Sequence, residues 1–402
     1  KNYFYPDLPK GYQVSQHTTP ICKGGHVTIR TAEAERNIEL NRIHIEEDAG
    51  KSLHDVDPFN TSIDYNRAGV PLVEIVTEPN LYSAEEATAY LTELRKLVRW
   101  LDVCDGNMEE GSLRCDANVS IRLKGDKKLG TRVEVKNLNS IRNVRKAIEY
   151  EVKRMITMVE KGEAVQQQTR SFDADNDTTF ALRTKEEAND YRYFPDPDLP
   201  PFIVTDEQIN HIRASMPALP EALVERYKSE LLLSDYDARA LCDDRDTILY
   251  FEEIIKKTAH YKSAANWLLG PVKSWLNEQS AGIGAFPLSA ATMAALVDLV
   301  EGGRLSFSVA SSRLLHQLIE RKSADPMAVA TELNLLQDSD AGAVAAWVDE
   351  VLSKMPEKVA EYRKGKKGLI GLFMGEVKKV SGGKADPKVA TQLLTDKLNA
   401  RP

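Results

Sequence analysis

Cysteine is scarce in this sequence. Four cysteines occur among 402 residues, they lie far apart, and no two of them form a Cys-x-x-Cys pair. Isolated cysteines of this kind argue against a structural zinc site and against a framework of disulfides. We therefore expect free thiols in a reducing compartment, and we predict a cytoplasmic location.

Long hydrophobic runs are missing as well. The sequence has no stretch of about 18 uncharged apolar residues, the length that suggests a membrane-spanning helix, and it does not open like a secretory signal. It starts at Lys1, so we expect a longer protein whose N-terminal region is not included. Hydrophobic residues make up 42% and charged residues 28%, which is typical of a soluble globular chain. The length predicts two or three domains.

Several catalytic motifs are also absent. The sequence contains no Gly-x-x-x-x-Gly-Lys-Ser/Thr phosphate loop, no Gly-x-Ser-x-Gly elbow, no His-Glu-x-x-His and no Gly-Gly-Ser-Ser stretch of the amidase type. Phosphate chemistry in this protein would therefore depend on carboxylates, a metal ion and arginines. The net charge of −8 argues against a uniformly basic surface for nucleic acid but permits a local basic patch.

A proline-rich stretch at residues 191–201 separates two kinds of sequence. Short alternating segments and two long helical patterns precede it, and almost only helical patterns follow. We place a domain boundary near Thr205 and a second break at residues 335–342. The predicted domains are 1–205, 206–334 and 335–402.

Two amphipathic helices are predicted in the first part. Residues 83–102 begin with a Ser-x-x-Glu capping box formed by Ser83 and Glu86, followed by apolar residues at helical spacing. Residues 140–161 show a second apolar stripe, and Gly162 stands where a C-terminal cap is expected. Both helices require a sheet to cover.

The sheet is indicated by residues that alternate in polarity. Residues 112–123 alternate without a fault, residues 124–130 form a turn rich in glycine and lysine, and residues 131–138 alternate again. This pattern predicts an antiparallel hairpin. Further strands are predicted at residues 14–21, at 26–30 after a Gly24-Gly25 turn, at 38–47 and at 70–78.

The polar face of the predicted hairpin carries charges of both signs. Asp116 and Asn118 stand in mid-strand, where their strand propensity is low, and Glu134 and Lys136 share the face. Residues that oppose their local structure are often functional, whereas an ordinary solvated face of an antiparallel sheet is the alternative. Both interpretations stay open at this point.

An acidic cluster occupies residues 44–51, where His44 is followed by Glu46, Glu47 and Asp48. Magnesium usually takes one or two carboxylates together with substrate phosphates, so the cluster is a candidate magnesium site. The alternative is an exposed turn, and His44 by itself would be typical of a packed histidine.

A basic segment lies near the C-terminus. Residues 363–384 hold seven basic residues, a single acidic residue and six glycines, a net charge of +6. Short basic loops suit a phosphate backbone, because binding there comes from counterion release without reading of bases. A solvated basic face is the alternative.

Five long and irregular stretches resemble one protein family along the whole chain. They are Lys1–Asp7, His44–Lys51, Met108–Asn118, Lys136–Ser140 and Asp190–Pro195. Together they resemble the GatB family, the B subunits of aspartyl/glutamyl-tRNA amidotransferases.

The resemblance implies an ATP-using ligase of indirect aminoacylation, which converts Glu-tRNA(Gln) to Gln-tRNA(Gln) and Asp-tRNA(Asn) to Asn-tRNA(Asn). ATP phosphorylates the side-chain carboxylate of the misacylated amino acid, and ammonia displaces the phosphate. In this family the ammonia comes from glutamine hydrolysed on an amidase subunit, GatA, while a small subunit, GatC, clamps the two in a heterotrimer. ATP and Mg²⁺ are the implied cofactors.

The resemblance also implies a fold and a set of site residues. The fold is α+β, with a glutamine-synthetase-like antiparallel-sheet cradle followed by an all-α helical domain and an all-α YqeY-like tail. The family's Glu-x-His pair on its first strand has no counterpart here, so the implied metal site is incomplete. The implied metal ligands are Glu47, Asp116 and Glu134, and the implied ammonia-channel residues are Lys1, Lys10 and Glu47. By their position alone, Arg114 and Arg132 are candidates for a clamp on the phosphates. The basic segment supplies the candidate tRNA-binding residues Lys364, Lys366, Lys367, Lys378 and Lys379.

Two other functions are weighed against this one. A non-catalytic tRNA-binding scaffold would use only the helical part and the basic segment, and it would have no need of Asp116 and Glu134. A glutamine-synthetase-like enzyme that acts on a free amino acid would leave the basic segment unexplained.

Overall fold

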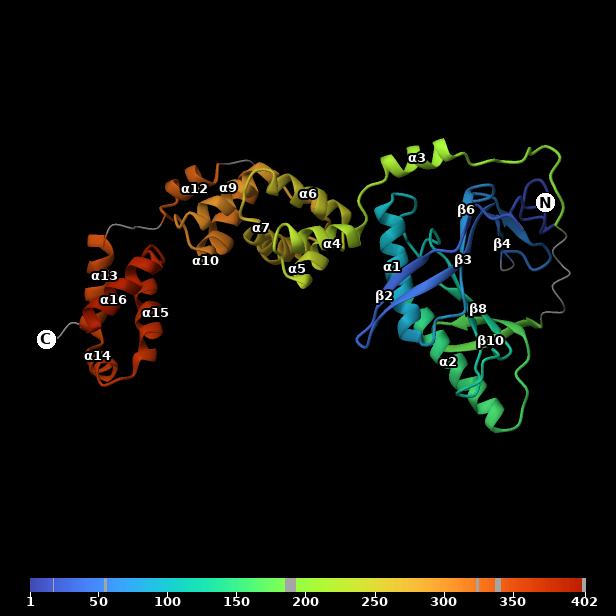
Figure 1. The fold of residues 1–402 in the computed structure, drawn as a ribbon, viewed down its shortest axis with the longest axis horizontal. Coiled ribbons are helices and arrows are strands. Elements are labelled where there is room, and N and C mark those ends of the chain that lie inside the picture. The colour runs from blue at the N-terminus through green and yellow to red at the C-terminus, as the bar shows by residue number, and fades with distance from the viewer. Residues whose placement is uncertain (17, 54–55, 185–192, 323–324, 337–340, 400–402) are drawn as a thin grey trace. The chain divides into compact units, whose positions relative to one another are not determined.

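The computed structural model describes residues 1–16, 18–53, 56–184, 193–322, 325–336 and 341–399 (Figure 1). The chain forms two compact units, Lys1–Pro217 and Ala218–Pro402. The first unit combines sheets and helices, and the described part of the second unit is helical, so the predicted α+β class is confirmed. The boundaries at 205 and 334, the cradle and the YqeY-like tail stay predictions. Residues 190–192 of the predicted motif Asp190–Pro195 lie outside the described part of the chain.

One sheet of the first unit is built around a long strand, β3. β3 (Glu35–Glu47) pairs antiparallel with β2 (His26–Arg30) and β1 (Cys22–Lys23) at one edge and with β6 (Pro71–Thr77) at the other. The predicted strands at 26–30, 38–47 and 70–78 are therefore confirmed.

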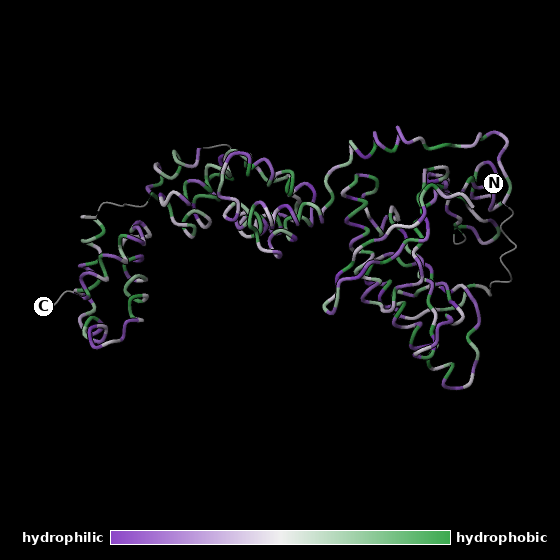
Figure 2. The backbone as a smooth tube through the Cα atoms, viewed as in Figure 1, coloured by the Kyte–Doolittle hydropathy of each residue, from purple (hydrophilic) through white to green (hydrophobic). Residues whose placement is uncertain are grey.

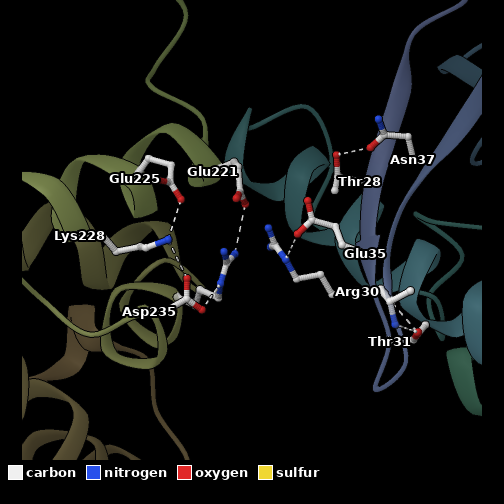
Figure 3. Close-up of polar contacts among 11 residues, drawn as sticks. Thr28, Arg30, Thr31, Glu35, Asn37, Glu221, Glu225, Lys228 and Asp235 are labelled. Atoms are coloured by element: carbon white, nitrogen blue, oxygen red, sulfur yellow. Dashed lines mark hydrogen bonds and ion pairs between the residues drawn. The ribbon is translucent and has the colours of Figure 1, made fainter.

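Polar pairs fasten the β2–β3 hairpin, as Figure 3 shows. The Arg30 Nε donates to Glu35 at 2.6 Å, and the Thr28 hydroxyl donates to Asn37 at 2.9 Å. Both pairs join residues that stand directly opposite each other in the β2–β3 ladder, where cross-strand contacts stabilise a sheet.

Two predictions near the first sheet are wrong. Among the described residues of 14–21, only Ser15 makes a β-bridge. Backbone bonds join Val14 and Gln16 to β3, and the Gln16 amide oxygen accepts from the backbone of Ile21 and Ile45. The expected Gly24-Gly25 turn does not separate paired strands. β1 and β2 follow the same antiparallel register along one edge of β3, and both glycines adopt positive φ within this run.

The second sheet has the order β10-β9-β8-β7. β7 (Cys115–Val119) and β8 (Val133–Leu138) form the predicted antiparallel hairpin, and β9 (Gln168–Asp173) pairs antiparallel with β10 (Thr178–Thr184). β8 and β9 are parallel, however, so the expected purely antiparallel sheet is corrected to a mixed one. The reason is that helix α2 connects β8 to β9 as a crossover, which brings the two strands into the same direction.

Two helices pack on these strands and enclose the core of the first unit (Figure 1). α1 (Ala84–Trp100) begins at the cap Ser83, whose side chain accepts from the Glu86 amide, and α2 (Ile141–Glu160) begins at the cap Ser140. Both predicted helices are confirmed, including Gly162 at positive φ after α2. A two-stranded sheet, β4 (Lys51–Leu53) and β5 (Ser62–Asp64), and helix α3 (Asp206–Ser215) complete the unit.

The described part of the second unit consists of short helices. They are α4 (Pro220–Ser229), α5 (Asp235–Leu241), α6 (Arg245–Ile255), α7 (Tyr261–Trp267), η2 (Leu268–Val272), α8 (Lys273–Glu278), η3 (Ile283–Ala285), α9 (Ala290–Glu301), α10 (Phe307–Val309), η4 (Ala310–Leu314), α11 (Leu315–Arg321), α12 (Pro326–Glu332), α13 (Ala341–Lys354), α14 (Pro356–Arg363), η5 (Lys367–Leu369), α15 (Ile370–Val380) and α16 (Pro387–Asn399).

Surface ion pairs join neighbouring helices of this unit. Lys228 of α4 contacts Glu225 at 2.9 Å and Asp235 of α5 at 3.1 Å (Figure 3). Hydrophobic and hydrophilic residues mix along the helices (Figure 2). Within the described ranges, no helix has both the length and the hydrophobicity required to cross a membrane.

Candidate functional site

The β7–β8 hairpin presents one buried face and one polar face. Ala117 and Val119 of β7 are buried in the core, whereas Asp116 and Asn118, which alternate with them, are exposed. We call the outward side the polar hairpin face. Its alternation follows from the period of two in a strand, and the sequence predicted it correctly.

A β-bulge shapes the polar hairpin face. The register between β7 and β8 shifts between Cys115 and Ala117, next to Asp116. On β8, Asn137 adopts φ +63° and donates through its amide to the Phe172 carbonyl at 3.1 Å. Asparagine tolerates this left-handed conformation better than most residues. Between the flanking pairs, Lys136 and Asn137 of β8 stand opposite the single Asp116 of β7, so the extra residue of the bulge lies on β8.

Lys136 joins the two carboxylates of this face. Its Nζ contacts Asp116 Oδ2 and lies 3.4 Å from Glu134 Oε1. Burial of the ammonium lowers the pKa of Lys136, but the carboxylates of Asp116 and Glu134 outweigh burial and raise it above its ordinary value. A cation therefore already stands between Asp116 and Glu134.

Glu134 is also held from the neighbouring strand. The hydroxyl of Thr169 on β9, which is 1% exposed, donates to Glu134 Oε2 at 2.8 Å. Thr169 stands opposite Glu134 in the parallel β8–β9 pair. Sequence reasoning missed this residue, because the parallel pairing that brings it to Glu134 leaves no local signal.

The acidic cluster reaches the hairpin through Asp48. The buried Asp48 carboxylate follows β3 and accepts from Arg114, the residue before β7, at 2.8 Å. Its other oxygen accepts from Arg67 at 2.5 and 3.1 Å. The structure thus brings together two motifs that the sequence singled out separately. Arg132, the other expected clamp residue, is exposed just before β8.

The residues expected to line an ammonia channel form a connected group. Glu47 accepts from the Lys10 ammonium and, at 2.7 Å, from the Val14 amide. The Lys1 and Lys10 ammonium groups lie 4.3 and 5.4 Å from the centre of the Tyr12 ring. Lys1 also lies 3.6 Å from Asp196.

A compact set of metal-type donors occurs at His44, Glu46 and Glu74. The His44 Nε2 lies 3.2 Å from Glu46 and 2.7 Å from Glu74, and the three donor atoms all lie within 4.8 Å of one another. His44 is 6% exposed, and its Nδ1 has no hydrogen-bond partner among the described residues. Glu74 was missed by the sequence, because only the register of β6 against β3 places it opposite His44.

The three expected metal ligands do not form a set of this kind. In the described ranges, His44, Glu46 and Glu74 form the only group of at least three acidic, histidine or cysteine side chains whose donor atoms all lie within 4.8 Å of one another. Asp116 and Glu134 converge on Lys136, while Glu47 is held by Lys10. Of the three expected ligands, Asp116 and Glu134 therefore share one contact partner, and their role as metal ligands stays a prediction.

The five lysines expected to bind tRNA are exposed around the ends of α14 and α15. Lys366 contacts Glu361 at 3.0 Å, and Lys379 contacts Glu376 at 2.5 Å. The Lys367 ammonium lies 4.2 Å from the centre of the Tyr362 ring. The others in the set are Lys364 and Lys378.

Comparison with known proteins gives concordant results along the chain. Residues 1–210 match a family model described as the GatB/GatE catalytic domain, and residues 249–398 match one described as a GatB domain. Proteins named as the B subunits of aspartyl/glutamyl-tRNA(Asn/Gln) amidotransferases are similar to 99% of this chain: those of Bordetella petrii (46% identical, 84% of its length covered), Geobacter sulfurreducens (46%, 83%) and Pelagibacter ubique (44%, 81%). The chain therefore belongs to the GatB family of amidotransferase B subunits.

Proposed function

We propose that this chain carries out the ATP-dependent transamidation of misacylated Glu-tRNA(Gln) and Asp-tRNA(Asn) in the cytoplasm. The name of its relatives supports the reaction and the tRNA substrates. The observations that carry the chemistry are the meeting of Asp116 and Glu134 at Lys136 and the pairing of Arg114, which directly precedes β7, with Asp48. The polar hairpin face lies within the part of the chain that matches a catalytic-domain model, so the scaffold alternative is not favoured.

Asp116 and Glu134 fit a magnesium ion. They lie on adjacent strands, and both already contact one cation, the Lys136 ammonium. Magnesium commonly takes one or two carboxylates and completes its shell with water and phosphate oxygens. When bound, it would neutralise charge on the phosphates of ATP. The resemblance adds Glu47 as a third ligand, which requires Lys10 to release its carboxylate.

The arginines of the face are proposed to serve the phosphoryl group. Transfer of phosphate from ATP to the side-chain carboxylate of the misacylated amino acid brings two anions together. Fixed positive groups lower the cost of that approach because they are already oriented before the reaction. Arg114 is oriented by Asp48, and Arg132 stands exposed beside β8.

Ammonia then displaces the phosphate from the activated carboxylate. We propose that it passes Lys1, Lys10 and Glu47, whose contacts through Tyr12 form a continuous polar group. The ammonia would come from an amidase subunit, GatA, with GatC as the third member of the complex. The described residues supply no amidase serine motif, and the naming of the relatives as B subunits supports an assembly of several different chains.

The test of this function is tRNA-dependent ADP release by the full-length protein, reconstituted with its amidase and small subunits. We expect release with Glu-tRNA(Gln) and little with correctly charged Gln-tRNA(Gln). Asp116→Asn should lower the rate by about 10²–10³-fold, the usual cost of removing one preorganised electrostatic contact, while tRNA binding is kept.

The matched control is Asp126→Asn, which changes an exposed aspartate in the turn between β7 and β8. It should retain the wild-type rate. ADP release that does not depend on misacylated tRNA would contradict the function, and full activity of Asp116→Asn would exclude the polar hairpin face as its site.

A further inference from the structure

One buried carboxylate holds two arginines from different parts of the chain. Asp48 Oδ2 accepts from Arg67 Nε at 3.1 Å and Nη2 at 2.5 Å, and Asp48 Oδ1 accepts from Arg114 Nη2 at 2.8 Å. The Asp48 side chain is 9% exposed. Each carboxylate oxygen therefore orients one guanidinium group, and we call Arg67 and Arg114 the arginine pair.

The arginine pair keeps a surplus of positive charge and of donors. Two guanidinium groups face one carboxylate, which leaves a net charge of +1. A guanidinium has five N–H donors, and Asp48 uses two nitrogens of Arg67 and one of Arg114. The side chains of Arg67 and Arg114 are 44% and 51% exposed, so the remaining donors are accessible.

The backbone around Asp48 is fixed. The Asp48 amide donates to the Val70 carbonyl at 2.8 Å, and the Gly69 amide donates to the Asp48 carbonyl at 2.8 Å. Arg67 also lies directly against Gly111, where a Cβ atom would come within 2.7 Å of Nη1 and where φ is +81°. A glycine at this position therefore leaves the room that the guanidinium occupies.

A second buried carboxylate in the same unit provides a comparison. Glu151 of α2 also binds two arginines, Arg154 at 2.8 Å and Arg170 at 3.0 Å, but their side chains are only 17% and 11% exposed. Arg154 lies on α2 itself, and Arg170 joins α2 to β9. The arginine pair on Asp48 has a similarly buried anchor but presents its guanidinium groups to solvent, as a binding site for an anion requires.

We propose that Arg67 and Arg114 together bind the terminal phosphoryl group of a nucleoside triphosphate, with Asp48 as their positioning residue. The proposal rests on the proposed function, and it adds Arg67 and Asp48 to the expected Arg114. Planar guanidinium groups bind phosphate oxygens in a bidentate manner. A buried anchor shared by both arginines reduces the conformational entropy that would be lost when the phosphate binds.

The experiment measures equilibrium binding of ATP and ADP to the reconstituted complex, with Mg²⁺ present and without tRNA. Arg67→Lys and Arg114→Lys keep the charge but lose the planar fork. We expect each variant to bind ATP about 10-fold to 100-fold more weakly, the range for losing hydrogen bonds to a charged group, and to bind ADP within about twofold of wild type. Asp48→Asn should weaken ATP binding in the same direction.

Arg30→Lys is the matched control, because Arg30 pairs with Glu35 on the surface of β2 and β3. It should bind ATP as wild type does. Thermal unfolding of each variant establishes that it is folded. If Asp48→Asn does not fold, the ATP affinities of Arg67→Lys and Arg114→Lys test the proposal. The phosphate could also belong to the tRNA backbone, so tRNA binding by the two lysine variants is measured as well. If these variants lose tRNA affinity but keep their ATP affinity, the arginine pair binds the RNA backbone and the proposal is overturned.

The failure of this proposal is distinguishable from the failure of the function. Wild-type ATP affinity in both lysine variants, combined with tRNA-dependent ADP release by the wild type, would overturn the arginine pair and leave the function standing. Equal weakening of ATP and ADP would also overturn it, since the site would then not be specific for the terminal phosphate. Absence of ATP binding by the wild type without tRNA would overturn the arginine pair as a preformed site, while the function is decided separately by tRNA-dependent ADP release.

Discussion

Charged residues are organised differently in the two units of this protein. In the first unit, charges converge on shielded carboxylates from different segments of the chain. Asp48 meets Arg114, 66 residues later, and Glu151 of α2 meets Arg170 of β9. In the C-terminal helices, the lysine pairs are mostly local, as between Lys379 and Glu376, and their side chains are exposed.

This difference indicates that charged residues serve two different purposes in the two units. Shielded and oriented charges interact strongly and keep their geometry, which suits chemistry on a small reacting group. Exposed lysines are screened by salt and each surface pair contributes little to stability, but together they attract a long polyanion. The two regions should therefore respond in opposite ways to mutation and to salt.

The largest effect is expected on stability at Glu151, which is completely buried. Glu151→Gln leaves Arg154 and Arg170 without a counter-charge, so we expect a loss of about 3–5 kcal/mol in the free energy of unfolding. Chemical denaturation of the wild type and the variant measures it. Glu149→Gln, which breaks the exposed pair with Arg145 on the same helix, should change stability by less than about 1 kcal/mol. Equal losses of stability in Glu151→Gln and Glu149→Gln would contradict the distinction between buried and exposed ion pairs.

An intermediate effect is expected at Lys10, whose pair with Glu47 is only partly shielded. Lys10→Ala should lower transamidation supported by glutamine by roughly tenfold, an energy of about 1.4 kcal/mol, because the proposed route of ammonia passes this contact. Transamidation supported by added ammonium salt should stay at the wild-type level. If both activities fall together, Lys10 serves the reaction itself or the fold and does not guide ammonia.

The smallest effect is expected in the basic segment. Changing Lys366 and Lys367 together to alanine should weaken tRNA binding several-fold and reduce the slope of log affinity against log salt by about one unit for each lost phosphate contact. A filter-binding series over several salt concentrations measures both. The matched control changes Lys256 and Lys257, two adjacent exposed lysines at the end of α6. An unchanged slope in the first variant would exclude these lysines from the tRNA site.

Local patterns in the sequence predicted α1, α2 and the β7–β8 hairpin, but no predicted strand covered β9 or β10. The caps Ser83 and Ser140 mark the starts of α1 and α2, because a side chain that satisfies a free amide acts within three residues. The alternation around Asp116 predicted the polar face of β7, because the side chains of a strand point to opposite sides in turn. The α+β class follows from these same local signals.

The pairing of the strands was harder to predict from the sequence. The sequence did not indicate that β8 and β9 run parallel, and so it missed the contact between Thr169 and Glu134. It also predicted a strand at 14–21, where Ser15 alone among the described residues makes a β-bridge. Pairing depends on which strand a connection brings alongside, and this information is not contained in any short window of residues.

The sequence by itself determined which residues of this protein carry charge on which face of each element, since periodicity and capping are local properties. The tertiary structure alone decided that Asp48 anchors both Arg67 and Arg114, that Thr169 donates to Glu134, and that Glu74 meets His44. These contacts form between distant segments, because the packing of sheets and helices sets their distances and shields their charges from water.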